Sequence, residues 1–305
     1  MKYVTRTGGA TVTVFVPYDC KNHCPFCINK AEYQNKDGFS IDEIIKSIKI
    51  MSIMTPNCDF VFTGGEPLAD CDALEKMLMS VHQKDTNHKV FINTTLPVGK
   101  RKDEDYLSTY LNYWYYRGWI TGINVSRHLE RYVEECYDKI FKQLDFEPRI
   151  NCVLYRLHLE DPKIKQKLIK FVERFKGVTD YIQFRKDYVV TTPENLYDEE
   201  NDEILQLLKD TFEYKGLQSK YRMRCGYEFD YNGYRISYHK TLPYSKIPLG
   251  NDTYVLYDII IKQNGSIRED WDTCSVVAFR GRKTDINANE LDLTAYKNVV
   301  YEEYK

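Results

Sequence analysis

The chain has 305 residues, with 43 Lys and Arg against 45 Asp and Glu, and a formal net charge of -2. This length allows one large α/β domain, or one domain with a modest extension, and excludes two complete enzymes. No run of basic residues follows a pattern suited to a phosphate backbone, so we expect no nucleic-acid partner.

The first ten residues, MKYVTRTGGA, lack the apolar core of a signal peptide. No segment approaches the roughly 20 apolar residues that span a bilayer, so we expect a cytoplasmic protein with no membrane partner. The chain contains nine cysteines. In a reducing compartment, cysteines indicate metal ligands or reactive thiols rather than a disulfide framework.

Short apolar runs alternate with longer helical stretches along the first two thirds of the chain. The expected strands are 11–17, 60–63, 89–93, 120–126, 149–154 and 181–185. Helices are expected to begin at Ser40, Asp70, Asp103, Glu130 and Asp161. Six strand-and-helix units are too few for a closed eight-stranded barrel. They predict an α/β fold, an open partial (β/α)6 TIM-like barrel with its active site at the C-terminal ends of the strands.

Beyond about residue 212, the pattern changes to alternating aromatic and polar residues. The segments 227–239 and 254–270 carry Asn-Gly pairs at 232–233 and 264–265, and both are typical of β-hairpins. We therefore expect a barrel domain over 1–212 and a β-rich C-terminal cap over 213–305.

Three cysteines, Cys20, Cys24 and Cys27, form a C-x3-C-x2-C loop directly after the first expected strand. A structural zinc site is one interpretation, but zinc takes four ligands, and His23, Cys58 or Cys71 would have to complete the set. Three thiolates on a short loop suit a 4Fe-4S cluster in which the fourth iron has no protein ligand. Such an iron can bind a cofactor or substrate.

The segment CKNHCPFC at 20–27 resembles the cluster loop of the radical S-adenosylmethionine superfamily, and FTGGEP at 62–67 resembles its second signature. The resemblance implies that the open iron chelates the methionine amine and carboxylate, while Gly64, Gly65 and Glu66 hold the amine. An external reductant such as flavodoxin or ferredoxin would then supply the electron that cleaves S-adenosylmethionine. The 5'-deoxyadenosyl radical formed would abstract hydrogen from the substrate.

Other cofactor-binding residues follow from the same resemblance. Phe26 would pack near the adenine, although an ordinary core aromatic is an equal interpretation. Ser126 and Arg127 would reach the ribose and carboxylate, although Arg127 also fits an ordinary surface position. Asn93 is a weaker candidate, as is Asn151. The strand segment 183–185, with Phe184 at its centre, would line the adenine through its backbone.

The remaining cysteines lack a motif, so no second cluster is expected. A partial barrel with a β-rich cap suits a small-molecule substrate enclosed at the barrel mouth. Carboxylates of the cap can accept hydrogen bonds from a guanine-like base, and its aromatic rings can stack on one. The substrate candidates are Asp230, Tyr231 and Asp270. In architecture the chain resembles the queuine lyases of queuosine salvage, which release a 7-deazaguanine base.

Three alternatives remain open. Two are radical enzymes, a glycyl-radical activase and a small-peptide modifier, and both need an open groove for a polypeptide. The third is a non-catalytic iron-sulfur protein that senses redox state or transfers electrons, and it leaves the GGEP segment without a role. The sequence assigns no catalytic residue for hydrogen transfer.

Overall fold

The structure is a computed structural model. It describes residues 2–5, 11–18, 20–22, 24–27, 38–54, 58–82, 86–97, 104–130, 137–179, 181–187, 199–217, 226–240, 246–250, 253–256 and 258–268. Of residues 2–5, 54, 104, 246–250 and 253–256 it describes the backbone only. The substrate candidate Asp270 lies outside the described residues.

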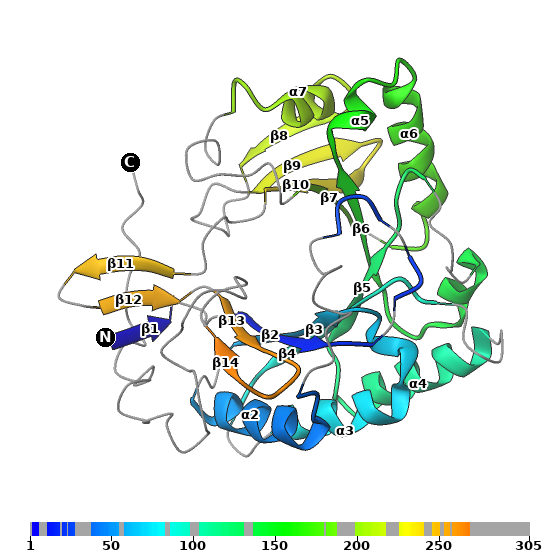
Figure 1. Cartoon of the computed structure of the whole chain (residues 1–305). Helices are drawn as coiled ribbons and strands as arrows, with labels where there is room; N and C mark the ends of the chain where they lie inside the picture. Colours follow the sequence, from blue (N-terminus) through cyan, green and yellow to red (C-terminus); the bar gives the residue numbers. More distant parts are fainter. Residues whose placement is uncertain are drawn as a thin grey trace.

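All six expected strands form, and they lie side by side in chain order as one parallel sheet. They are β2 (Thr11–Val16), β3 (Asp59–Gly64), β4 (Lys89–Thr94), β5 (Gly122–Ser126), β6 (Arg149–Leu154) and β7 (Tyr181–Lys186). The sheet curves into an open arc, and the helices lie on its convex side (Figure 1). The predicted partial α/β barrel is confirmed.

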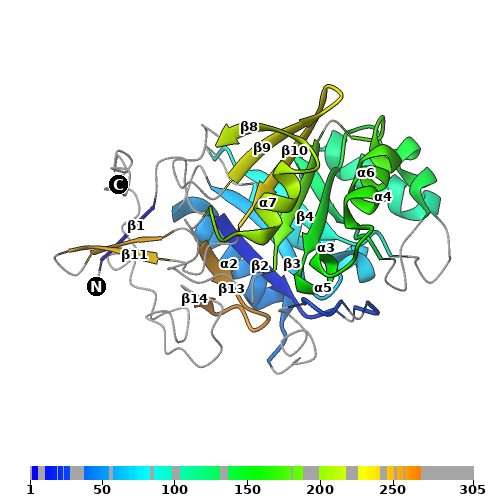
Figure 2. The same ribbon diagram turned by 90° about the horizontal axis from the view of Figure 1, so that it is seen from above.

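Helices cover the convex face of the sheet, and the view from above shows the same arrangement (Figure 2). The longer ones are α2 (Ile41–Met54), α3 (Cys71–Val81), α4 (Glu104–Tyr116) and α6 (Ile164–Phe175). The shorter ones are η1 (Pro67–Ala69), η2 (Asp138–Gln143), α5 (Arg156–Leu159) and α7 (Glu203–Lys209). Their apolar faces and alternate strand residues form one continuous core. Among the described residues, no helix has the length and apolar character needed to cross a bilayer.

Two of the expected helix starts hold, and two differ. Ser40 and Asp70 accept hydrogen bonds from the first turns of α2 and α3. Asp103 lies outside the described residues. No described helix begins at Glu130, and the next one along the described chain is η2. The helix expected at Asp161 begins at Ile164, because the Asp161 carboxylate accepts from the Lys163 amide and closes a turn first.

The strands after residue 212 extend the same sheet at both edges. At one edge β10 (Tyr234–His239) pairs in parallel with β7, followed by β9 (Gly226–Tyr231) and β8 (Glu213–Leu217). At the other edge β13 (Asp258–Ile261) pairs in parallel with β2, followed by β14 (Ile267–Arg268). Both predicted Asn-Gly turns are present, with positive φ at Asn232, Gly233 and Gly265.

A second, three-stranded sheet pairs a strand near the N-terminus with two strands from residues 246–256. It contains β1 (Lys2–Thr5), β12 (Thr253–Leu256) and β11 (Lys246–Gly250), in that order. The strands on the C-terminal side of residue 212 continue the barrel sheet, and the domain boundary there stays a prediction.

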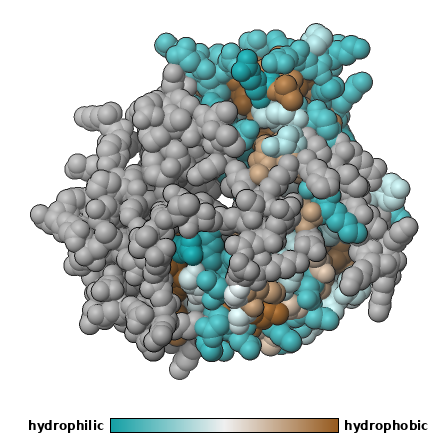
Figure 3. All heavy atoms as spheres, viewed as in Figure 1, coloured by the Kyte–Doolittle hydropathy of each residue, from teal (hydrophilic) through white to brown (hydrophobic). Residues whose placement is uncertain are grey.

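Side chains along each strand alternate between the convex face, which packs on the helices, and the concave face, which we call the inner face. Strands β3, β4 and β6 show this directly, because fully buried residues alternate with partly exposed ones. On the outside of the molecule, hydrophilic residues predominate at the margin over α7 and the nearby strands, with apolar patches beneath them (Figure 3). The inner face is therefore the part of the sheet left to a ligand rather than to the helices.

Candidate functional site

The loops that follow the parallel strands meet at one edge of the sheet, because the strands point the same way. The cysteine loop follows β2, and the GGEP segment follows β3. Thr95 follows β4, and Arg127 follows β5. The two sequence signatures and the predicted strand-end residues are thus brought to a common edge.

The cysteine loop is partly exposed at all three thiols. The Cys27 amide donates to the Cys24 carbonyl over 3.2 Å, which closes a tight turn between these two ligand candidates. Burial raises the pKa of the Cys20 thiol to about 11, and the nearby charges of Glu66 and Cys27 add to the shift. The loop and the GGEP segment follow the paired strands β2 and β3, so they lie at neighbouring strand ends.

The described His, Cys, Asp and Glu side chains include no group of three that could hold a single metal ion. A 4Fe-4S cluster has a different requirement, since each cysteine binds a separate iron of the cube. His23, which the zinc interpretation would use, lies outside the described residues.

Backbone hydrogen bonds hold the GGEP segment against the end of β2. The Gly65 amide donates to the Val16 carbonyl over 3.0 Å, and the Glu66 amide donates to the Tyr18 carbonyl over 3.3 Å. Gly64 has φ +125°, and a Cβ there would lie 2.3 Å from the Val16 oxygen. Glycine is therefore required at 64 by the neighbouring strand, a contact that the sequence alone does not reveal.

The Glu66 carboxylate joins the ends of β3 and β4. Its Oε1 accepts from the Leu68 amide at 3.0 Å and the Thr94 hydroxyl at 2.6 Å. Its Oε2 accepts from the Thr95 amide at 2.9 Å and the Thr95 hydroxyl at 2.7 Å. Burial raises the pKa of this carboxyl, and the four hydrogen bonds oppose the shift. Because a carboxylate has about four acceptor positions, these donors occupy its capacity.

Arg127 is fully buried, not exposed as an ordinary surface arginine would be. Its Nη1 donates to the carbonyls of Thr95 and Ser126, and its Nε lies 3.9 Å from an Asp138 oxygen. The guanidinium also lies over the Phe141 ring, 5.6 Å from the centroid. Arg127 thus links the ends of β4 and β5 to η2.

Phe26 contacts an aromatic and imidazole group at the ends of β5 and β6. Its ring centroid lies 4.7 Å from that of His128 and 5.5 Å from that of Tyr155. Burial lowers the pKa of His128 to about 3, with smaller effects from His158 and Arg127. The neutral His128 accepts from the Val153 amide through Nδ1 at 3.2 Å. Phe26 therefore packs the cysteine loop against the ends of β5 and β6.

The other predicted residues divide between the two faces of the sheet. Asn93 and Ser126 lie on the inner face, and the Asn124 amide nitrogen donates to Asn93 Oδ1 over 2.8 Å. The Phe184 side chain lies on the convex face, in the core. It packs on Phe171 of α6, with ring centroids 5.9 Å apart. Only its backbone remains for the role predicted from the sequence.

Asp230 and Tyr231 lie at the opposite end of the strands from the cysteine loop. They end β9, at the turn that leads into β10. Because β10 runs parallel to β7, this turn lies at the N-terminal ends of the parallel strands. Asp230 accepts from the Gly233 amide at 2.9 Å, and the Tyr231 ring packs on Phe212. The structure therefore does not bring these two substrate candidates to the strand ends where the signatures meet.

A repeated sequence feature on the inner face was missed in the sequence analysis. Five strands carry an isoleucine followed directly by a polar, uncharged residue. These pairs are Ile92-Asn93, Ile123-Asn124, Ile150-Asn151, Ile182-Gln183 and Ile236-Ser237. The isoleucines are buried in the core, and the polar partners face inward. The repeated pair is the sequence signal that could have identified these five inward-facing polar residues.

One family model matches part of the chain. Residues 7–113 match a family model described as a 4Fe-4S single cluster domain. The matched segment contains Cys20, Cys24 and Cys27 and the whole GGEP segment. No curated protein sequence matches the chain significantly.

Two solved structures are similar over most of the chain. One is a histidine-tagged form of anSMEcpe with bound AdoMet, at 14% identity and TM-score 0.58, covering 93% of this chain and 81% of that one. The other is native anSMEcpe with bound AdoMet and Cp18Cys peptide, at 14% identity and TM-score 0.57, covering 96% of this chain and 84% of that one. At this identity, the likeness establishes a common fold.

Proposed function

We propose that the protein is a radical S-adenosylmethionine enzyme with a 4Fe-4S cluster on Cys20, Cys24 and Cys27. The observation that carries the proposal is the placement of the cysteine loop and the GGEP segment at the C-terminal ends of the paired strands β2 and β3, where the Glu66 amide donates to the Tyr18 carbonyl, two residues before Cys20. The family match over residues 7–113 supports the cluster, and the two similar structures with bound AdoMet support the second cofactor.

The residues present fit this pair of cofactors. Three thiols on one partly exposed loop are the donor set of an iron-sulfur cluster with one open iron. When bound and reduced, this cofactor pair supplies a 5'-deoxyadenosyl radical. The backbone of the GGEP segment would hold the amine, since the Glu66 side chain is already occupied by four protein donors. Phe26, Asn93, Ser126 and Arg127 stay proposed as cofactor-binding residues.

The proposal is tested by the products of S-adenosylmethionine cleavage. The protein, reconstituted anaerobically with iron and sulfide and reduced with dithionite, should form 5'-deoxyadenosine. A Cys24→Ala variant should lose both the iron-sulfur absorbance and the product. A matched Cys58→Ala variant should keep both, because Cys58 is buried at the other end of β3.

A reconstituted protein that keeps its cluster yet forms no 5'-deoxyadenosine above the Cys24→Ala level would contradict the proposal. That result would favour the non-catalytic iron-sulfur protein. Flavodoxin and ferredoxin are the proposed physiological reductants, and replacing dithionite by the reduced form of either protein should preserve product formation.

For the substrate, we keep queuine lyase as the proposal from the sequence, so that the enzyme would release a 7-deazaguanine base. The structure gives this proposal less support than the sequence did, because Asp230 and Tyr231 lie at the opposite end of the strands from the cysteine loop. Peptide modification is the second candidate, and one observation favours it: a similar structure carries a bound peptide.

Stimulation of 5'-deoxyadenosine formation distinguishes the two candidates. Queuine, its nucleoside and short peptides containing Ser or Cys are added separately to the reduced enzyme. A lyase consumes queuine, whereas a peptide modifier leaves queuine intact and changes the mass of the peptide. Absence of both stimulation and consumption with queuine would exclude the lyase.

A further inference from the structure

Three neighbouring strands carry uncharged polar side chains at one level of the inner face. Asn151 on β6 is paired in register with Gln183 on β7, and Gln183 with Ser237 on β10. We call these three residues the amide row. Gln183 is 6% exposed and Ser237 is fully buried. The row lies near the middle of these strands, below the strand ends that the cysteine loop and the GGEP segment share.

Two oxygen atoms of the amide row have no partner in the described part of the chain. Asn151 Oδ1 and Ser237 Oγ are buried and have no hydrogen-bond partner among the residues that the structure describes. Asn124 Oδ1, on the adjacent strand β5, is in the same situation. Buried polar atoms are normally paired, since an unpaired one loses its hydration without compensation. All three atoms can accept a hydrogen bond, so together they favour a ligand that donates several.

The charges around the amide row restrict the kind of donor. Below it, the Tyr181 ring lies between two guanidinium groups, with Arg149 at 5.7 Å and Arg235 at 4.9 Å from its centroid. Above it, Arg185 and His239 occupy the next inward positions of β7 and β10. Of these arginines, Arg235 donates to Glu228 over 2.8 Å.

Glu228 balances the charge of Arg235. An ammonium ligand would face repulsion from Arg149 and Arg185 on this wall, whereas a neutral N–H group would not. The acceptor atoms are also amide and hydroxyl oxygens, which lack the formal charge that a carboxylate offers a cation. The wall therefore matches neutral, amide-type donors, such as a lactam N–H, an exocyclic amine on a heterocycle or a peptide N–H.

We propose that the amide row, Asn151, Gln183 and Ser237, recognises the substrate by accepting hydrogen bonds from its neutral amide-type N–H groups. This inference rests on the proposed function, because it assigns the substrate surface of the same enzyme. A deazaguanine base and a peptide both present this chemistry, and the experiment separates these two sources.

The test compares Ser237→Ala and Asn151→Leu with the wild-type chain, using two probes. The probes are queuine and a capped hexapeptide containing Ser and Cys, measured by calorimetry and by stimulated 5'-deoxyadenosine formation. For the probe that binds, each substitution should weaken Kd and raise KM by roughly three- to tenfold, the value of one hydrogen bond. In Ser237→Ala, formation of 5'-deoxyadenosine without probe should stay within about twofold, since β10 carries none of the residues proposed to bind the cofactors.

Ser80→Ala serves as the matched control, because Ser80 is also a buried serine but donates to the Met77 carbonyl. This control should lower the Tm and leave probe binding unchanged. Ser237→Ala should raise the Tm of the ligand-free protein by about 2 °C, because it removes a buried hydroxyl without a described partner. Opposite signs of the Tm change, with binding lost only in Ser237→Ala, are the expected result.

Unchanged Kd and KM in both row variants would overturn the inference, as would failure of both probes to bind the wild-type protein. Failure of the proposed function looks different, because it abolishes 5'-deoxyadenosine in every variant. The calorimetric Kd still decides the inference in that case.

Discussion

Glu66 and Gly64 are neighbours in a motif that suggests ligand binding, and both make contacts within the protein. The Glu66 carboxylate is 3% exposed and accepts four hydrogen bonds from the β3 and β4 ends. Gly64 leaves room for the carbonyl oxygen of Val16. At these two positions, the motif maintains the shape of the edge on which a cofactor would lie.

Replacement of Glu66 by leucine should cost about 3 kcal/mol or more of the free energy of unfolding, because it leaves buried donors unsatisfied. Glu66→Gln should cost less, since one amide oxygen keeps part of the set. Urea unfolding of both variants measures the difference. Equal stability of Glu66→Leu and the wild type would show that the four hydrogen bonds do not form in solution.

Gly64→Ala should destabilise the protein far more than Gly118→Ala. Both glycines have positive φ, so both substitutions carry the backbone cost of about 1–2 kcal/mol. Only at Gly64 would the new Cβ meet another atom, whereas Gly118 has nothing within 4 Å. Urea midpoints of the two variants should therefore separate clearly. Equal midpoints would mean that the Val16 contact is not maintained.

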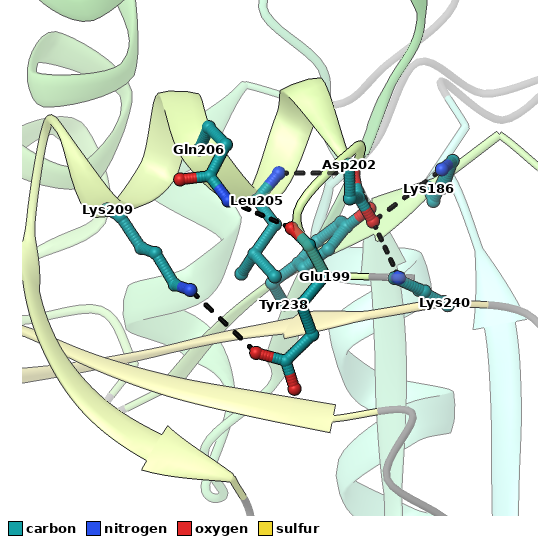
Figure 4. Close-up of polar contacts among 8 residues, drawn as sticks. All are labelled: Lys186, Glu199, Asp202, Leu205, Gln206, Lys209, Tyr238 and Lys240. Atoms are coloured by element: carbon teal, nitrogen blue, oxygen red, sulfur yellow. Dashed lines mark hydrogen bonds and ion pairs between the residues drawn. The ribbon is translucent and has the colours of Figure 1, made fainter. Parts of the chain in front are cut away.

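At the scale of elements, α7 is fixed to the sheet by a buried group of charges (Figure 4). Asp202, 1% exposed, caps α7 through the Leu205 amide and lies 2.9 Å from the Lys240 ammonium. Lys186 approaches the same oxygen at 3.6 Å, and the Tyr238 hydroxyl donates to the carboxylate. Lys186 is the last residue of β7, and Lys240 follows β10, which pairs with β7, so one carboxylate holds three elements together.

Asp202→Asn should cost about 3–5 kcal/mol of the free energy of unfolding, because a buried ammonium loses its counter-charge. The exposed pair of Lys165 and Asp210, 3.1 Å apart, provides the matched control, and Asp210→Asn should change stability by less than about 1 kcal/mol. Chemical denaturation checks both values. A second substitution, Lys240→Met, in the Asp202→Asn background should recover part of the loss, and no recovery would contradict the pairing.

The elements themselves could largely be predicted from local patterns. The six parallel strands are short apolar runs between turn residues, and the two hairpins carry Asn-Gly turns, so each is visible within a few residues. The edges that β10 and β13 join depend on contacts between distant segments, which no local pattern contains. Asp230 and Tyr231 were predicted to bind the substrate because chain order alone does not show that their turn lies at the N-terminal ends of the parallel strands.

The candidate site divides in the same way. The three cysteines and the GGEP segment could be predicted because each motif is recognisable within eight residues or fewer of sequence. The repeated isoleucine-polar pair indicates that Asn151, Gln183 and Ser237 face inward, but only strand pairing shows that they are neighbours. Phe184 shows the opposite case, because the alternation that turns Gln183 inward turns Phe184 toward α6.

For the whole molecule, acid should weaken the fold through its buried histidines. Burial lowers the pKa of His239 to about 3, and Arg185, Arg149 and Arg235 add to the shift. The unfolded chain binds a proton near pH 6.5 and the folded chain does not, so this contribution to stability falls as pH decreases below about 6.5.

Between pH 6.5 and 5 the loss from His239 alone should reach about 2 kcal/mol. A His239→Gln variant lacks this proton linkage and should show a correspondingly flatter dependence of unfolding free energy on pH. Denaturation at pH 8 gives the cost of the substitution itself, with the proton absent from both states. Parallel pH profiles for the two proteins would show that His239 titrates normally.

The pairing of β13 with β2 has a consequence for the order of assembly. Asp258 accepts a hydrogen bond from Thr13, 245 residues earlier, and β13 covers the side of β2 away from β3. During synthesis, the strand that leads into the cysteine loop is therefore an open edge until nearly the whole chain has emerged. Metallation before β13 has formed would act on a loop whose supporting strand lacks one neighbour, so a strand made late in synthesis completes a site whose cysteines are made early.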